Sequence, residues 1–96
     1  MYAVIFTATV GDRDSRYRKM AGQLRDLAIA DFGCTDFISA TEGEQEIAIS
    51  YWPDEASIKN WKQQAEHKVA QQFGREGWYK HYQVEVVKIL RSYSGN

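Results

Sequence analysis

Hydrophobic and polar residues follow two different periods along the chain, and the order of these periods predicts six elements. Alternating or continuous apolar runs predict strands, whereas apolar residues that recur every three or four positions predict helices. The expected elements are a strand, a helix, a hairpin of two strands, a helix and a strand, over residues 2–10, 15–30, 34–42, 46–52, 54–73 and 79–92. No linker or repeat interrupts them, so residues 1–96 are predicted to form a single domain.

Apolar stripes predict which face of each helix is buried. In the first helix the stripe consists of Tyr17, Met20, Leu24, Leu27 and Ala28. Pro53 lacks the N–H that a sheet ladder needs and therefore ends the third strand, and Asp54 is a good N-cap for the helix that follows. In that second helix the stripe consists of Ile58, Trp61, Ala65, Val69 and Phe73. Each helix is thus expected to pack one face against the sheet.

The order of elements is that of a ferredoxin-like β-α-β-β-α-β fold, an α+β arrangement in which two helices cover one face of a four-stranded antiparallel sheet. The last strand is apolar on both sides, with Tyr82, Val84, Val86 and Leu90 on one and Val87, Ile89 and Tyr93 on the other. Because helices cover only one face, a monomer would expose a large apolar patch. We therefore expect a homodimer in which two sheets pack face to face around a shared α+β barrel.

Composition removes several classes of function. The 96 residues include 12 basic and 13 acidic side chains, which give a net charge of −1 without the basic patch of a nucleic-acid-binding protein. No apolar run approaches the ~20 residues that span a bilayer, and the N-terminus lacks the basic start of a signal peptide. The single cysteine, Cys34, excludes an internal disulfide and suits a reducing compartment. We expect a cytoplasmic protein without nucleic-acid or membrane partners.

The sequence contains no P-loop, no Rossmann glycine pattern and no nucleophile elbow. The two histidines, His67 and His81, do not have zinc-ligand spacing, and Cys34 has no companion cysteine. We therefore expect neither a metal nor a cofactor. Residues 48–93 contain all three tryptophans and both histidines, and such dense aromatic side chains with polar tips can line a ligand cavity.

Trp61 and His67 are the candidate catalytic residues. Trp61 lies on the buried stripe, where it either packs in the core or forms the wall of a pocket between helix and sheet. His67 falls off that stripe and would face water in an unbroken helix. If the helix breaks near residues 64–66, the imidazole could reach the pocket as an acid or a base.

Five further side chains are candidates for substrate binding. Tyrosines offer phenol hydroxyls, an arginine offers a positive charge to an anionic ligand, and a threonine offers a hydroxyl to whichever cavity its strand faces. These residues are Tyr51, Tyr79, Tyr82, Arg75 and Thr7. Each also has a structural interpretation, as a packing residue, a β-former or a surface residue.

From residue 46 onward the sequence resembles a known family. The strand EIAISYW, the helix DE-x2-I-x2-W-x5-H, the corner GREGWY-x2-Y and the closing V-x-V-V-x3-R-x-Y are similar to the antibiotic biosynthesis monooxygenase family, in particular to its uncharacterised bacterial members. The resemblance spans essentially the whole chain and implies a small dimeric α+β barrel. Because one fold can host unrelated functions, it indicates the fold more strongly than the activity.

The resemblance also implies a chemistry. The family includes cofactor-independent oxygenases of polycyclic phenols, in which the deprotonated substrate itself supplies the electrons for oxygen. By resemblance, Trp61 would match the pocket tryptophan, Tyr82 or Tyr79 the substrate-binding tyrosine, and Arg75 the basic group. We therefore predict a monooxygenase that acts on a small aromatic, phenolic or quinol substrate between sheet and helices.

Two alternatives stay open. A non-catalytic small-ligand-binding or stress-response protein of the same fold would use the same pocket without oxygen chemistry. A haem-binding or haem-degrading protein is the other alternative, and relatives of that kind carry an asparagine on the first strand and a proximal histidine late in the second helix. Here Thr7 and Thr9 stand where the asparagine would be expected, and His67 follows Trp61 too closely, so that resemblance is incomplete.

Overall fold

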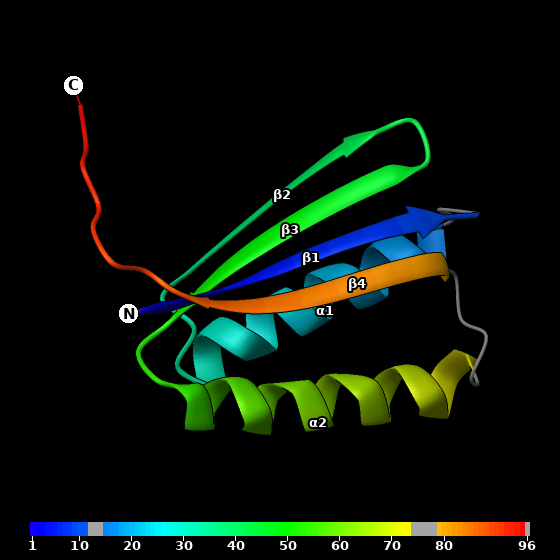
Figure 1. Ribbon diagram of the computed structural model, residues 1–96. Coiled ribbons are helices and arrows are strands. Elements are labelled where there is room, and N and C mark those ends of the chain that lie inside the picture. The colour runs from blue at the N-terminus through cyan, green and yellow to red at the C-terminus, as the bar shows by residue number, and fades with distance from the viewer. Residues whose placement is uncertain (12–14, 74–78, 96) are drawn as a thin grey trace.

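Two helices pack on one face of a four-stranded sheet (Figure 1). The structure is a computed structural model that describes residues 1–11, 15–73 and 79–95, with side chains described over 1–11, 17–67 and 81–95. The elements are β1 (Tyr2–Val10), α1 (Ser15–Asp31), β2 (Asp36–Glu42), β3 (Gln45–Trp52), α2 (Glu55–Phe73) and β4 (Tyr79–Lys88). Their order confirms the predicted β-α-β-β-α-β succession.

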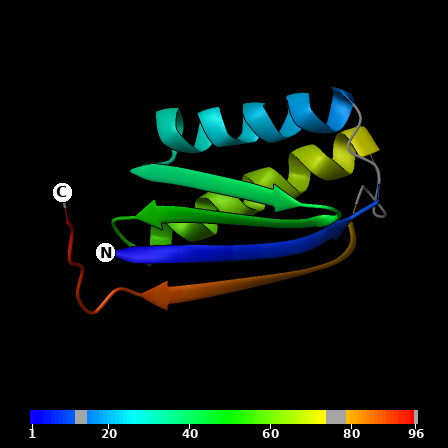
Figure 2. The same cartoon turned by 90° about the horizontal axis from the view of Figure 1, so that it is seen from above.

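The strand order in the sheet is β2-β3-β1-β4, and every neighbouring pair is antiparallel. Seen from above, both helices lie on the same side of the strands (Figure 2). This arrangement is the ferredoxin-like α+β fold that the sequence predicts. It places β2 and β4 at the two edges and leaves the other face of the sheet without a helix.

The strand register decides which side chains face the helices. Directly paired residues point to the same side of a sheet, and Phe6 pairs with both Ala48 and Val84. Phe6 packs against a cluster that includes Tyr17 of α1, so this row faces the helices. Neighbouring residues along each strand point the other way. The helix-free face, called the open face below, therefore carries Ala3, Ile5, Thr7, Ile38, Ile47, Ile49, Tyr51, Glu85 and Val87.

The core is built around an indole. Trp52 is fully buried at the end of β3, where it packs with Ala28, Cys34 and Ile58. Its Nε1–H donates a hydrogen bond of 2.8 Å to Ser50 Oγ, so the polar end of the ring is satisfied inside the core. A smaller cluster of Ala8, Val10 and Tyr17 joins the far end of β1 to α1, and the Tyr17 hydroxyl donates to the Glu46 carboxylate.

Local sequence accounts for the ends of the elements. Gly33 follows α1 with φ of 86°, and Gly43 opens the hairpin loop between β2 and β3 with φ of 60°; both lie in the left-handed region that favours glycine. Asp54 caps α2 as expected, because its Oδ1 accepts a hydrogen bond of 2.7 Å from the Ser57 N–H. This bond stabilises the carboxylate, so the pKa of Asp54 is lowered from its ordinary value.

Two predicted boundaries are wrong. The hairpin's first strand begins at Asp36 rather than residue 34, and the last strand ends at Lys88 rather than residue 92. Leu90 and Tyr93, which were expected on opposite faces of that strand, lie beyond it and are 80% and 86% exposed. The apolar character of residues 89–93 extended the predicted strand. Its neighbour β1 starts at Tyr2, and only Met1 precedes it; the Met1 carbonyl oxygen accepts a hydrogen bond of 3.1 Å from the Ile89 N–H, and no residue is left for 90–93.

Candidate functional site

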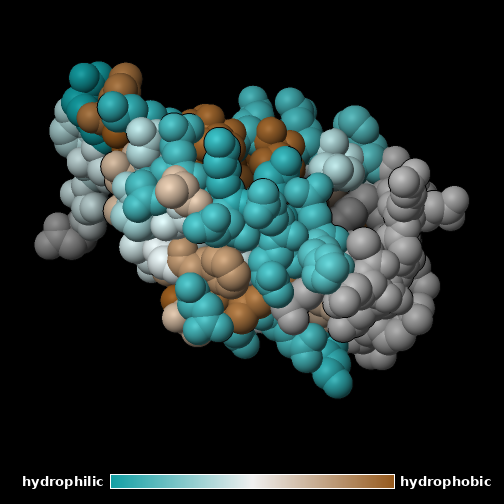
Figure 3. All heavy atoms as spheres, turned by 90° about the horizontal axis from the view of Figure 1, so that it is seen from below, coloured by the Kyte–Doolittle hydropathy of each residue, from teal (hydrophilic) through white to brown (hydrophobic). Residues whose placement is uncertain are grey.

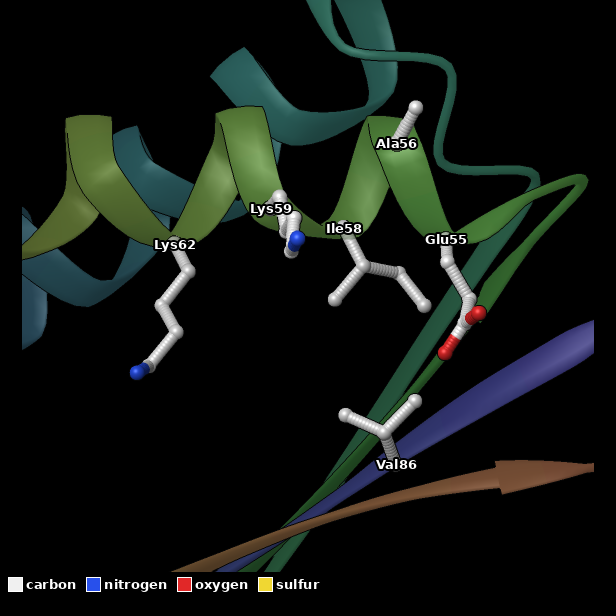
Figure 4. Close-up of a pocket in the computed structure, with 6 residues that line it drawn as sticks. All are labelled: Glu55, Ala56, Ile58, Lys59, Lys62 and Val86. Atoms are coloured by element: carbon white, nitrogen blue, oxygen red, sulfur yellow. The ribbon is translucent and has the colours of Figure 1, made fainter.

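A cavity of about 410 Å³ lies between α2 and the edge strand β4. It is lined by Glu55, Ala56, Ile58, Lys59 and Lys62 from α2 and by Val86 from β4 (Figure 4). We call this space the α2–β4 cleft. In the close-up, the side chains of Ile58 and Val86 point toward each other across it. This cavity lies between one helix and the sheet, on the β4 side, and Trp61, which the sequence places at the pocket, is not among its described lining residues.

Apolar atoms at the cleft are accessible although they face the helix layer. Val84 and Val86 of β4 are 38% and 48% exposed, and Tyr82 in the same row is 57% exposed. Viewed from the α2 side, apolar patches appear between polar side chains (Figure 3). A surface of this kind can hold an apolar ligand body, because removing it from water is favourable at roughly 25 cal/mol per Å².

Charged side chains surround this apolar surface of the cleft. Lys59 and Lys62 each present an ammonium, and Glu55 presents a carboxylate near the start of α2. The Lys62 Nζ lies 3.8 Å from Oε1 of Glu66, one helical turn further along α2, and both side chains are more than half exposed. The cleft therefore combines an apolar surface with an excess of one positive charge among its lining side chains.

Trp61 lies on the core side of α2. Its ring centroid is 6.2 Å from that of Trp52 and 5.8 Å from that of Phe32, so the three rings form one aromatic cluster. It is partly buried and packs against the Trp52 core. It is not among the six residues that line the cleft. Ile58 and Lys62, which are close to Trp61 along α2, do line the cleft. The contacts of Trp61 therefore help to fix the position of the α2 side of the cleft.

His67 is exposed, and α2 runs without a break from Glu55 to Phe73. The helix break that an inward-facing imidazole would require is therefore absent. His67 follows Ile58 by nine positions, which is about two and a half helical turns and places it on the opposite side of the helix. In this structure the imidazole points away from the cleft.

The predicted substrate-binding residues are not brought together. Thr7 and Tyr51 lie on the open face, separated from the cleft by the sheet itself. Tyr82 lies on the helix side, where its ring stacks on Phe6 at a centroid distance of 6.1 Å. Arg75 and the Tyr79 side chain lie outside the described residues; the Tyr79 backbone begins β4.

Sequence reasoning missed the lysines and the glutamate of the cleft. Glu55, Lys59 and Lys62 recur at spacings of four and three, so they share one face of α2. That spacing is visible in the sequence, but it reads equally well as a solvated helix surface. Only the separation between α2 and β4 turns this face into the wall of a cavity.

Cys34 belongs to the core rather than to the cleft. It is 4% exposed and free, and its Sγ donates to the Asp36 carbonyl oxygen at 3.1 Å. Burial raises the pKa of this thiol above its ordinary value, and hydrogen bonds with the backbone only partly oppose that shift. A buried thiol with a raised pKa is a poor nucleophile, which is consistent with a structural role.

The described residues hold no group of three or more histidine, cysteine, aspartate or glutamate side chains arranged to bind a metal ion. Over the same part of the chain, neither helix has the length and apolar character that crossing a membrane requires.

Two curated proteins are similar in sequence. An uncharacterised Bacillus subtilis protein, YqjZ, is 34% identical over 91 residues, which is 94% of this chain and 80% of that protein. A jasmonate monooxygenase named ABM, from Pyricularia oryzae, is 33% identical over 101 residues that cover all of this chain. The alignment spans 46% of that longer protein. No family model matches the chain.

Solved structures share the fold at low sequence identity. SnoaB, described as a cofactor-independent oxygenase from Streptomyces nogalater, has a TM-score of 0.74 at 11% identity and covers 95% of this chain and 94% of its own. Rv0793 from Mycobacterium tuberculosis has a TM-score of 0.77 at 18% identity, with 97% and 98% covered. MhuD, in a mutant with two manganese protoporphyrin IX per active site, scores 0.65 at 9% identity, with 99% and 100% covered. Identities this low establish the fold alone.

Proposed function

Because this chain belongs to the antibiotic biosynthesis monooxygenase family, we propose that it is a cofactor-independent monooxygenase that binds a small phenolic or quinol substrate in the α2–β4 cleft. The observation that carries the proposal is the cavity of about 410 Å³, whose apolar part lies between Ile58 and Val86. Ligand cavities are typically apolar with a few polar groups at the rim, and this volume suits one small molecule. The names of two similar proteins, a jasmonate monooxygenase and a cofactor-independent oxygenase, support the reaction class.

The reaction needs no external reductant. A phenol with an unsubstituted para carbon reacts with one O₂ to give a quinone and one water. One oxygen atom forms the new carbonyl and the other leaves as water, so the substrate supplies all four electrons. The protein then has to bind the ring, favour loss of the phenolic proton and hold the carbon accessible to oxygen.

Trp61 has a positioning role in this proposal. Through its contacts with Trp52 and Phe32 it holds the α2 wall at a fixed distance from the sheet, and it does not itself touch the substrate. Tyr82 is exposed on the helix side of β4, and this position supports a contact with a ligand that extends along that strand.

Oxygen uptake with a panel of phenols that have an unsubstituted para carbon, such as 1-naphthol, tests the reaction. We expect uptake that saturates with substrate and falls at least about tenfold in Val86→Trp, because the indole fills the cavity. Ile29→Trp is the matched control, since it adds the same ring at an exposed position on α1. Activity that is equal in the two variants would show that the cleft is not the site.

A non-catalytic ligand-binding protein is the second candidate, and it is favoured because the cleft-lining residues that the structure describes include no histidine. Thermal shifts by small aromatic compounds without oxygen uptake from any phenol in the panel would support this candidate. The haem alternative gains no similar support, because His67 faces away from the cleft on an unbroken helix.

The open face carries a second proposal, a homodimer. Ile38, Ile47 and Val87 on this face are 52%, 48% and 38% exposed, and Ile5 and Ile49 lie between them. A contiguous apolar sheet surface of this kind is uncommon on a monomer, and an identical surface related by a two-fold axis covers it. The shared sheet packing would leave each α2–β4 cleft on the outside.

Adjacent valines provide a matched test of the dimer. Val87→Asp places a carboxylate on the open face, whereas Val86→Asp places one on the helix side of the same strand. Sedimentation should give twice the chain mass for the wild type and for Val86→Asp, and the monomer mass for Val87→Asp. A wild type that sediments as a well-folded monomer would contradict the dimer.

A further inference from the structure

The charged side chains of the α2–β4 cleft are separated along its length. Glu55 and Lys62 are seven residues apart on α2, which is about 10 Å along the helix axis. In the close-up, Ile58 and Val86 lie beside Glu55, and the Lys62 side chain points toward the sheet at the other end of the cleft (Figure 4). The cleft therefore has an acidic end at Glu55 and a basic end at Lys62, and Lys59 lies beside Ile58 between them.

The basic end is available to a ligand. Among the described residues, the one ion pair of Lys62 is the exposed contact with Glu66 at 3.8 Å, and Lys59 has no carboxylate within salt-bridge distance. Exposed pairs of this kind contribute little, because water screens them and ordering two long side chains is unfavourable. An anion that also buries the exposed apolar surface of Val86 can replace Glu66 at low cost.

We propose that Lys59 and Lys62 bind the single negative charge of a small amphipathic ligand whose apolar body lies on Val86, opposite Ile58. The recognised chemistry is one anionic oxygen group, a carboxylate or a phenolate, attached to a ring or short apolar body. This inference rests on the proposed function only in taking the cleft as the substrate site. For a phenol, the ammonium groups would favour the deprotonated form, which is the form that reacts with oxygen.

A pair of ligands of equal shape tests the charge. 2-Naphthoate carries a carboxylate, and 2-naphthamide replaces it with a neutral group of similar size. Calorimetric or fluorescence titration of the full chain should show about tenfold tighter binding of naphthoate, the factor expected from two exposed charge contacts. The preference should shrink as salt is raised, because exposed charges are screened.

Two double variants assign the preference to residues. Lys59→Gln with Lys62→Gln should bind both ligands with the affinity that the wild type has for naphthamide. Glutamine is a good helix former, so circular dichroism should be unchanged. Arg18→Gln with Lys19→Gln removes the same charge from exposed positions on α1 and should keep the full preference. Equal binding of the two ligands by the wild type, a preference that survives in the Lys59/Lys62 variant, or binding of neither ligand would each overturn the proposal.

A titration of 2-naphthol separates the two anionic groups. If phenolates are recognised, the pKa of bound naphthol should fall by about one unit in the wild type and not in the Lys59/Lys62 variant, since tenfold in affinity equals one unit. If the wild type prefers naphthoate but does not change the pKa of bound naphthol, the ligand is a carboxylate. This result would support the same anion site. These binding measurements do not require turnover. The oxygen-uptake experiment can therefore fail while the anion site is supported, and the anion site can be contradicted while oxygen uptake is observed.

Discussion

The Trp52 core and the α2–β4 cleft are built from the same two layers, yet one is closed and the other is open. In the core, Trp52 and Ala28 are 0% exposed although one comes from the sheet and the other from a helix. At the cleft, Val84 and Val86 face the helix layer as well and remain 38% and 48% exposed. Facing a helix is therefore not enough to bury a residue in this protein.

The difference follows from side-chain size. Three aromatic rings, Trp52, Trp61 and Phe32, occupy the space between the helices and β3; Trp61 stacks on Trp52 with centroids 6.2 Å apart and meets Phe32 in a tilted contact at 5.8 Å. Their bulk holds α2 away from the sheet. On β4 the corresponding positions are valines, which are too short to reach α2 across the same separation, so the space above them becomes a cavity. The aromatic core thus acts as the spacer that keeps the cleft open.

The largest expected effect compares truncations in the two regions. Trp52→Ala should lower the free energy of unfolding by about 3–5 kcal/mol, because it removes a fully buried indole and leaves a cavity. Val86→Ala should cost less than about 1 kcal/mol, since half of the valine is already in water. Urea denaturation followed by circular dichroism measures both values.

Trp52→Phe is the control for the indole hydrogen bond. It keeps an aromatic ring but removes the donor to Ser50 Oγ, so its cost should fall between the two truncations. Similar losses of stability for Trp52→Ala and Val86→Ala would contradict the distinction between a closed core and an open cleft.

Trp61 tests the spacer directly. Trp61→Ala should lower the free energy of unfolding by about 2–3 kcal/mol, less than for a fully buried tryptophan because Trp61 is partly exposed. It should also weaken ligand binding at the cleft, since α2 can then move toward the sheet. Trp61→Phe should keep most of both properties. A Trp61→Ala protein that loses stability but binds ligand as the wild type does would show that the core does not set the width of the cleft.

The closed region was largely predictable from the sequence and the open one was not. Helical spacing identified Ile58 and Trp61 as buried-stripe residues, and both pack in the Trp52 core. Periodicity, however, gives the direction of a side chain and not the distance to the opposite layer. For that reason the sequence assigned the pocket to Trp61, whereas Lys59 and Lys62 line it.

The misplaced site residues have the same origin. Thr7 and Tyr51 are correctly placed on strands, but the sequence alone does not say which face of a strand the helices cover. The register supplies that information, and it puts both residues on the open face. The sequence did not decide whether the His67 side chain faces the pocket or water. Because α2 is unbroken, the side chain faces water.

Cys34 provides a reporter inside the closed region. Its thiol is 4% exposed, and burial raises its pKa, so little reactive thiolate is present near neutral pH. A disulfide reagent such as dithionitrobenzoate should label the native protein much more slowly than the urea-unfolded chain. Trp52→Phe should accelerate labelling, whereas Val86→Ala should not. Rapid labelling of the native wild type would show that the core opens as readily as the cleft.

The smallest expected effect concerns Asp54, which caps the helix shared by both regions. Its pKa is lowered from an ordinary value of 3.8, mainly because the carboxylate accepts the Ser57 N–H. A group whose pKa is depressed by folding contributes stability above its unfolded pKa and loses it as the pH falls through the folded pKa. Wild-type stability should therefore decline below about pH 4, and Asp54→Asn, which still caps but does not titrate there, should decline less. Urea midpoints measured from pH 6 to pH 3 compare the two proteins, and parallel pH profiles would show that the cap does not depend on the charge. Because α2 packs against the core on one side and lines the cleft on the other, loss of this cap should weaken Trp52 burial and ligand binding together.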